Sequence, residues 1–206
     1  MKRLTSGLIV LLLPCLWVQA ALASEVYYLS IRSGQSTLLD AASDDLVDDP
    51  DMGELKVVYD GGTHTAGAFG WSFMDGRVEL EVTDGEAKVE SRGGMPPSAG
   101  VRCSLQSLMF NGFYDIETWS TWNPYVGLGF GGAVLTIEEG GAEDDDLVLA
   151  YQAGGGIAVR LGNNVAVDLQ YWFFVTSEYE LLVGNSEYQD LLQSHNLSLG
   201  LRYYLE

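Results

Sequence analysis

The stretch that decides the fold is NVAVDLQYWFFVT, residues 164–176. Its apolar side chains fall on every second position and share one face, which holds Val165, Val167, Leu169, Tyr171, Phe173 and Val175. Asp168 and Gln170 lie on the opposite face. A period of two is the pattern of a β-strand, whose successive side chains point to opposite sides. The alternation outlasts the about 5–6 residues of an ordinary strand and suits a strand that crosses a bilayer at a tilt, which takes about 9–11 residues.

Seven further segments show the same alternation. They are residues 26–33, 65–73, 77–83, 102–115, 124–134, 148–161 and 197–205. The connections alternate in length: 74–76, 116–123 and 162–164 are short or moderate, whereas 35–63, 91–101, 138–147 and 178–192 are long. Short turns on one rim and long loops on the other are typical of bacterial outer-membrane barrels. The sequence therefore predicts an all-β fold, an eight-stranded antiparallel up-and-down transmembrane β-barrel.

The polar faces of these strands indicate which side is the interior. They are rich in small residues and carry few charges, namely Arg32, Glu79, Glu81, Arg160, Asp168 and Arg202. A water-facing surface carries about 25–35% charged residues, whereas a narrow lumen needs small side chains and charges of both signs. We therefore expect mixed-sign contacts inside the barrel, formed by Glu79, Glu81, Arg160, Asp168 and Arg202. A soluble periplasmic barrel that binds an apolar ligand would have the opposite arrangement, with its apolar face inside.

Aromatic residues lie toward the ends of several predicted strands. They are Tyr27, Trp71, Phe73, Tyr125, Tyr171 and Tyr203. In a membrane barrel such residues form girdles at the two interfaces. The interior of an eight-stranded barrel is just wide enough for side chains to fill, so we expect no large diffusion pore.

The first residues have the pattern of an export signal. Met1-Lys2-Arg3 is followed by an apolar run over residues 8–18 and by the small-x-small pattern Ala21-Leu22-Ala23. The run is shorter than the about 20 residues of a spanning helix, so we predict a cleaved signal peptide over residues 1–23 and a barrel domain over residues 24–206. Cys103 is then the single remaining cysteine and cannot form an intramolecular disulfide.

The acidic residues concentrate in the predicted long loops. The chain has a formal net charge of −19, and loss of Lys2 and Arg3 with the signal peptide leaves −21, which excludes nucleic acid as a partner. Three of the loops hold 18 of the 29 acidic residues: Asp40, Asp44, Asp45, Asp48, Asp49, Asp51, Glu54, Asp60, Glu138, Glu139, Glu143, Asp144, Asp145, Asp146, Glu178, Glu180, Glu187 and Asp190. Calcium prefers several oxygen ligands, but no calcium-loop spacing is present. We expect solvated, mobile loops that bind divalent cations weakly at most.

Several strings resemble one known family. NPYVGLGFG at residues 123–131, AYQAGGG at residues 150–156, MFN at 109–111, FYD at 113–115 and the segment 195–205 are similar to strands of the Opa-like porin or surface-antigen family of small, OmpA-type outer-membrane barrels. The resemblance implies a place in the outer membrane of a Gram-negative bacterium and a role in envelope structure or surface interaction. Outer-membrane lipid is then the expected surrounding. The last strand also carries a spacing that barrel-assembly machinery recognises, in Ser198, Gly200, Tyr203 and Leu205.

Catalytic, cofactor-binding and metal-binding residues are not predicted. A lipid-modifying enzyme of the outer membrane would need a serine and a histidine on one face, whereas His195 and Ser198 are three apart and face opposite sides. His64 lies near Asp60 without a nucleophile motif, and we expect both histidines to be ordinary rim residues. The runs Gly61-Gly62 and Gly154-Gly155-Gly156 lack the residues of a phosphate loop and indicate close packing. We therefore expect a protein that is not an enzyme.

Overall fold

The computed structural model describes residues 26–39, 57–59, 61–92, 102–118, 120–139, 142–183 and 186–205. The predicted signal peptide lies outside these ranges, as do the acidic residues between Asp40 and Glu54 and Asp60. In the part of the chain that is described, no helix combines the length and the hydropathy needed to cross a membrane.

The described chain is built of strands. They are β1 (Val26–Leu38), β2 (Val57–Tyr59), β3 (Gly62–Phe73), β4 (Gly76–Arg92), β5 (Arg102–Asp115), β6 (Trp122–Glu139), β7 (Ala142–Arg160), β8 (Val165–Val183) and β9 (Ser186–Leu205).

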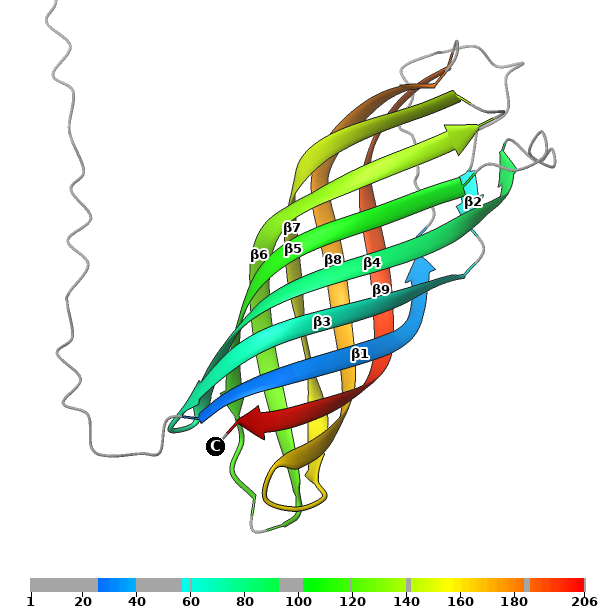
Figure 1. Ribbon diagram of the computed structural model, residues 1–206. Coiled ribbons are helices and arrows are strands. Elements are labelled where there is room, and N and C mark those ends of the chain that lie inside the picture. The colour runs from blue at the N-terminus through cyan, green and yellow to red at the C-terminus, as the bar shows by residue number, and fades with distance from the viewer. Residues whose placement is uncertain are drawn as a thin grey trace, which may run out of the picture.

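Eight of these strands close on themselves. β1 pairs with β3 on one side and with β9 on the other, and β3 to β9 pair in chain order, every pair being antiparallel. Figure 1 shows the resulting tilted barrel, on which the short β2 extends the β4 edge. Closure pairs the backbone groups that an open sheet would leave at its edges. The predicted eight-stranded up-and-down barrel is confirmed.

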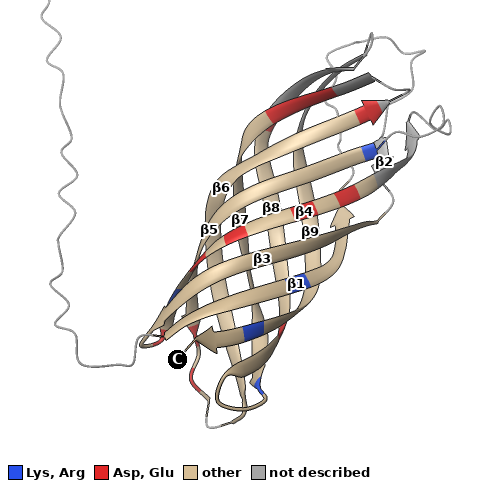
Figure 2. Ribbon diagram, in the orientation of Figure 1, with Lys and Arg blue, Asp and Glu red and all other residues tan. Residues whose placement is uncertain are grey.

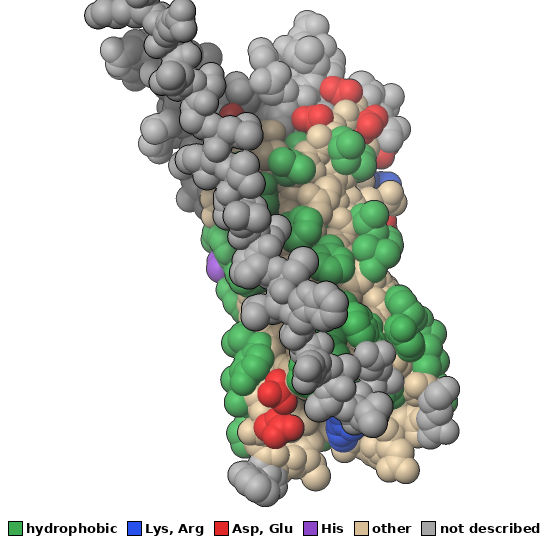
Figure 3. All heavy atoms as spheres, turned by 90° about the vertical axis from the view of Figure 1, so that its left-hand side faces the viewer, with side chains coloured by type: hydrophobic (Ala, Val, Ile, Leu, Met, Phe, Trp, Pro, Cys, Tyr) green, Lys and Arg blue, Asp and Glu red, His purple; other side chains and the backbone are tan. Residues whose placement is uncertain are grey.

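The alternation of each strand maps onto the two sides of the barrel wall. In β8 Leu169 is exposed on the outside, whereas Asp168 and Gln170 are buried inside. The other strands follow the same rule, and Figure 3 shows hydrophobic side chains spread over the outer wall. The polar faces line the lumen as predicted, which is the reverse of the arrangement in a soluble binding barrel.

The two rims differ. Strands β3 and β4 are joined by the two-residue turn Met74-Asp75, in which Met74 adopts a positive φ of 48°. The connections β5–β6 and β7–β8 and the end of β9 lie on the same rim, which we call the turn rim. The opposite end is the loop rim.

The strands extend further toward the loop rim than the sequence predicts. Segment 138–147 was expected to be a mobile loop, and this prediction is wrong, because β6 and β7 pair up to Glu139 and Ala142. The prediction for segment 178–192 is wrong in the same way, since β8 and β9 pair up to Val183 and Ser186. In β6 the acidic residues did not end the strand because Leu135 and Ile137 continue the buried face up to Glu138.

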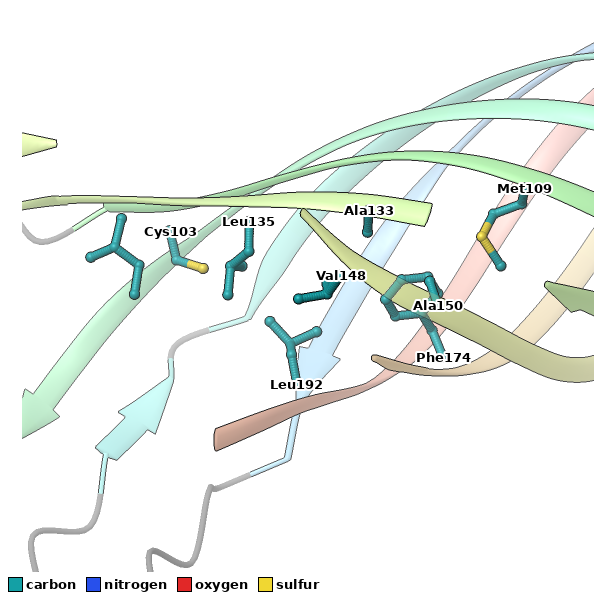
Figure 4. Close-up of a cluster of buried hydrophobic side chains, with 9 residues drawn as sticks. Cys103, Met109, Ala133, Leu135, Val148, Ala150, Phe174 and Leu192 are labelled. Atoms are coloured by element: carbon teal, nitrogen blue, oxygen red, sulfur yellow. The ribbon is translucent and has the colours of Figure 1, made fainter. Parts of the chain in front are cut away.

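An apolar cluster fills part of the lumen toward the loop rim. It consists of Cys103, Met109, Ala133, Leu135, Ile137, Val148, Ala150, Phe174 and Leu192 (Figure 4). Leu135 is 1% exposed and Ile137 6%, while Glu138 on the other face is exposed. Burial of this cluster gives the extended β6 and β7 strands an apolar interior to pack on.

One aromatic residue lies on the unexpected side of the wall. Tyr125 is 2% exposed and packs inside the lumen edge-to-face on Phe113, with ring centroids 5.6 Å apart. The prediction that Tyr125 belongs to an interface girdle is therefore wrong. The residue sits at an odd position in β6 with Gly127 and Gly129, which also face inward. Tyr27, Tyr171 and Tyr203 are exposed on the outside, as expected.

Candidate functional site

A network of buried charges crosses the lumen. The Arg32 guanidinium lies 2.8 Å from Oε2 of Glu79 and also pairs with Glu81, and these two residues come from alternate positions of β4. Tyr28 donates a hydrogen bond of 2.7 Å to Oε1 of Glu79. Because strand β4 places both carboxylates on its inner face, one arginine of β1 can bridge them.

Two further arginines complete the network. Arg202 of β9 lies 2.6 Å from Oδ1 of Asp168 on β8. Arg77 pairs with Asp115 at 2.9 Å and with Glu79 at 3.5 Å. Its guanidinium also covers the rings of Phe113 and Tyr125, at 4.2 and 4.4 Å from their centroids. Cation–π contacts of this kind strengthen in a desolvated setting.

The buried part of the network is electrically balanced, and Asp115 adds a partly exposed acid at its edge. Among the described residues the buried charged side chains are three arginines and three acids, each at most 3% exposed: Arg32, Arg77, Arg202, Glu79, Glu81 and Asp168. Desolvating a charge costs several kcal/mol, which pairing and hydrogen bonding must offset. The predicted inward direction and mixed-sign contacts of Glu79, Glu81, Asp168 and Arg202 are confirmed.

Arg160 departs from that prediction. It shares the phase of the inward residues of β7, but it is exposed at the turn rim and lies over the Tyr204 ring, 5.0 Å from its centroid. The prediction of a mixed-sign contact inside the barrel is wrong for this residue, because the wall ends at Arg160 and the side chain reaches water.

Glycines let the network and its aromatic neighbours fit. A Cβ at Gly127 would lie 2.6 Å from Phe113 and 2.8 Å from Trp172, and a Cβ at Gly154 would collide with the Tyr171 backbone. At Gly129 it would meet the amide of Asn111. The close packing predicted for the run Gly154-Gly155-Gly156 is therefore confirmed, as it is for Gly62 but not for Gly61, whose added Cβ would lie 3.7 Å from the nearest atom. The lumen is filled by side chains at this level.

A cavity opens between the network and the loop rim. It measures about 60 Å³. Its lining is mixed and includes the apolar Leu105, Phe174 and Leu192 and the polar Ser36 and His64. Its floor is the network, because Arg32 and Glu81 belong to both.

Several buried polar groups at this cavity have no hydrogen-bond partner within the described part of the chain. They are Nε and Nη1 of Arg32, both side-chain amide atoms of Gln170, and Nε1 of Trp172. The three side chains are at most 4% exposed, and all three line the cavity. An unmet buried donor costs about 1–3 kcal/mol, so this end of the cavity favours a partner that accepts hydrogen bonds.

The two histidines differ in environment. His64 faces inward, and its Nδ1 lies 2.9 Å from Oγ of Ser36, 28 residues away in sequence. It lines the cavity wall, which sequence analysis missed because the contact depends on the β1–β3 register. His195 faces outward and contacts Tyr171 through a 2.6 Å hydrogen bond, whereas Ser198 is buried inside. The predicted opposite facing of His195 and Ser198 is confirmed.

The described residues offer little for a metal. No group of three or more histidine, cysteine or acidic side chains is placed to hold an ion in the described ranges. The acidic residues named for calcium, Asp44 to Asp51, lie outside those ranges. Cys103 is a free thiol buried in the apolar cluster.

Comparison with known proteins decides the family. The profile of the outer membrane protein β-barrel domain matches residues 8–204. The chain belongs to the outer membrane protein β-barrel family. The match confirms the predicted family resemblance. It also confirms the predicted localisation in the outer membrane of a Gram-negative bacterium.

One curated relative and several solved structures are similar to this outer-membrane barrel. A candidate adhesin of Rickettsia bellii is 24% identical over 135 residues, which are 56% of this chain and 59% of that protein, so the match spans less than two thirds of the relative. AlkL, solved in lipid bilayers, has a TM-score of 0.62 at 16% identity, covering 100% of this chain and 97% of that one. The neisserial surface protein A scores 0.60 at 18% identity, covering 86% and 96%. OprG of Pseudomonas aeruginosa scores 0.53 at 17% identity, covering 88% and 97%. At these identities the structures show a shared fold.

The family also orients the barrel. In outer-membrane barrels the short turns lie on the periplasmic side and the longer connections outside the cell. The turn rim therefore faces the periplasm, and the loop rim and the cavity mouth face outward.

Proposed function

We propose that this outer-membrane barrel is a non-catalytic surface-interaction protein, in which a plugged barrel anchors acidic extracellular extensions. The observation that carries the proposal is the balanced network of buried side chains across the lumen. Because the interior is filled at this level, diffusion of a solute through the barrel is disfavoured. The loop rim is then the part of the protein free to act.

The charge of the loop rim favours a cationic partner. Glu138, Asp145 and Glu178 are exposed on the extended strands, and Figure 2 shows acidic residues along β4 and toward the loop-rim ends of β6 and β7. Complementary charge steers encounter and selects partners. The similarity to a candidate adhesin supports an attachment role. Ail of Yersinia pestis, which shares the fold, was solved with a heparin analogue; the negative rim of this chain argues against such a polyanion here.

The barrel wall is proposed to contact two further partners. Exposed outward residues such as Leu128, Leu199 and Leu201 form an apolar belt suited to outer-membrane lipid. The C-terminal strand β9 presents Tyr203 and Leu205 outward, while Ser198 and Gly200 face the lumen. This arrangement supports recognition of β9 by the barrel-assembly machinery.

The Ser36–His64 pair is the feature that favours the alternative, a lipid-modifying enzyme. Acyl transfer needs a serine next to a base, an orienting acid and donors for the oxyanion. In the described part of the chain no acidic side chain forms a hydrogen bond with His64. The backbone groups of β1 and β3 around the pair are taken up by strand pairing and do not form an oxyanion hole. We infer that the pair is a polar element of the cavity wall. Serine-reactive fluorophosphonate should leave the refolded protein unlabelled; labelling that disappears in Ser36→Ala would support the enzyme instead.

Attachment tests the proposed function. A non-adherent Gram-negative strain expressing the protein should bind polylysine-coated beads several-fold better than the empty strain and should not bind heparin-coated beads. The triple variant Glu138→Gln, Asp145→Asn, Glu178→Gln should lose much of this binding. The matched control changes the periplasmic rim, Asp75→Asn with Glu117→Gln, and should leave binding unchanged. Preference for heparin, or equal binding by both variants, would contradict the proposal.

A further inference from the structure

We propose that the cavity above the charge network is a binding site for a small, uncharged, single-chain amphiphile with a carbonyl head, such as a medium-chain amide or ester. The site opens to the outside and ends blindly on the network. It is therefore a receptor site within the barrel, independent of the attachment role proposed for the rim.

The walls of the cavity suit such a molecule. Its volume of about 60 Å³ is several times the about 10–15 Å³ that one water needs, so the cavity admits a slender ligand and excludes a bulky one. Leu105, Phe174 and Leu192 provide an apolar lining for a hydrocarbon chain. Figure 4 shows Phe174 and Leu192 among the side chains of the apolar cluster. Most small-molecule sites combine such a lining with a few placed polar groups.

The unpartnered groups define the head. Arg32 and Trp172 carry only donors at the atoms that lack a partner, and Gln170 offers two donors against one acceptor oxygen. Donors are thus in excess, so the complementary head is a hydrogen-bond acceptor. Gln170 and Trp172 follow Asp168 on the same face of β8, which places them next to the network.

Charge balance decides between a carbonyl and a carboxylate. The three buried arginines near this floor already match three buried acids. A carboxylate would add an unmatched negative charge close to Glu81, which lines the same cavity. Burying an uncompensated charge is strongly unfavourable, whereas a carbonyl oxygen accepts the same hydrogen bonds without it.

Solution NMR of the ¹⁵N-labelled protein in phosphatidylcholine nanodiscs tests the site, with the indole N–H signals as reporters. Titration with N-methyldecanamide should shift the Trp172 signal saturably and leave that of Trp71, which lies on the outer face, unshifted. Decanoate should need at least tenfold higher concentration at neutral pH. No saturable shift at Trp172, or decanoate binding as tightly as the amide, would overturn the proposal.

Matched variants assign the binding to the cavity. Gln170→Leu should raise the half-saturation concentration at least tenfold, whereas Gln35→Leu, the same change on the outer face of β1, should not alter it. Heat-dependent gel mobility checks that each variant is folded, and Leu105→Ser in the apolar lining serves if Gln170→Leu does not fold. Equal affinity of both folded variants for the amide would overturn the assignment.

A final arm separates a free ligand from membrane lipid, whose acyl chains carry the same ester carbonyl. Phosphatidylcholine with a nitroxide on its chain should broaden the Trp71 signal more strongly than that of Trp172, because the outer face contacts lipid directly and the lumen lies behind the wall. Broadening of Trp172 equal to or stronger than that of Trp71 would show that lipid enters the cavity and would contradict a ligand that arrives from outside the cell.

Discussion

At the scale of single residues, the lumen depends on reciprocal pairing. Asp168 is 2% exposed and lies 2.6 Å from Arg202, which also donates a hydrogen bond to the Tyr204 hydroxyl. Arg202 makes no second ion pair among the described residues. Removing the carboxylate therefore leaves a buried cation without a counter-charge.

The variant Asp168→Asn measures this dependence. We expect its free energy of unfolding to fall by about 3–5 kcal/mol, the usual cost of breaking a buried pair from one side. Urea unfolding of the protein refolded into lipid vesicles gives the value. Asp145→Asn, an exposed position on β7, is the control and should cost less than about 1 kcal/mol. Similar losses in both variants would mean that Arg202 is not desolvated.

At the scale of elements, the alternation predicted which faces of the eight strands point inward, because a strand has no other way to place its side chains. It could not predict where strands end beyond the membrane. There acidic residues such as Glu138 are tolerated on the outer face, while Leu135 and Ile137 continue the buried face. The polar composition of this segment is typical of a loop. The apolar residues at its inward-facing positions were the sign that the strand continues.

The extended strands predict a specific stability effect. Leu135→Ala should lower the free energy of unfolding by about 2–5 kcal/mol, since it leaves a hole in the apolar cluster. The neighbouring Val134→Ala, on the half-buried outer face, is the control and should cost clearly less. If segment 134–139 were a loop, the two substitutions would have equally small effects on urea unfolding.

The outer face of β8 gives a second prediction at this scale. Leu169→Arg should cost about 2–4 kcal/mol, because it puts a charge on the lipid-facing wall near mid-membrane. Leu161→Arg, the same change at an exposed position directly after β7 on the turn rim, should cost about 0–1 kcal/mol. Folding yield into vesicles, read by heat-dependent gel mobility, should fall for the first variant alone. Equal yields would reverse the assignment of the faces.

At the scale of the whole molecule, the cavity and the charge network were only partly predictable. The inward direction of Glu79, Glu81, Asp168 and Arg202 followed from the phase of their strands, whereas Arg77 and Asp115 were not among the predicted contacts. The cavity and the Ser36–His64 contact depend on which inward side chains of different strands meet at one height, and pairing register decides that. No local feature of the sequence indicates the register between β1 and β3, which brings Ser36 and His64 together although they are 28 residues apart.

The overall negative charge predicts a response to salt. At equal ionic strength, calcium chloride and sodium chloride should change the thermal midpoint alike, because the acidic segments act as solvated charge that salt screens over about 8 Å. Differential scanning calorimetry of the reconstituted protein provides the measurement. A shift of many degrees specific to calcium would reveal a genuine divalent-cation site.

Ion conductance tests the central claim most directly, since a lumen plugged by the network should not pass current. Single insertions of the refolded protein into a planar lipid bilayer should give no steady conductance above that of the bare membrane. The variant Arg32→Ala, Glu79→Ala, Glu81→Ala, which removes the β1–β4 bridge, should conduct and so demonstrate insertion. A stable ohmic conductance from the unaltered protein would contradict the account.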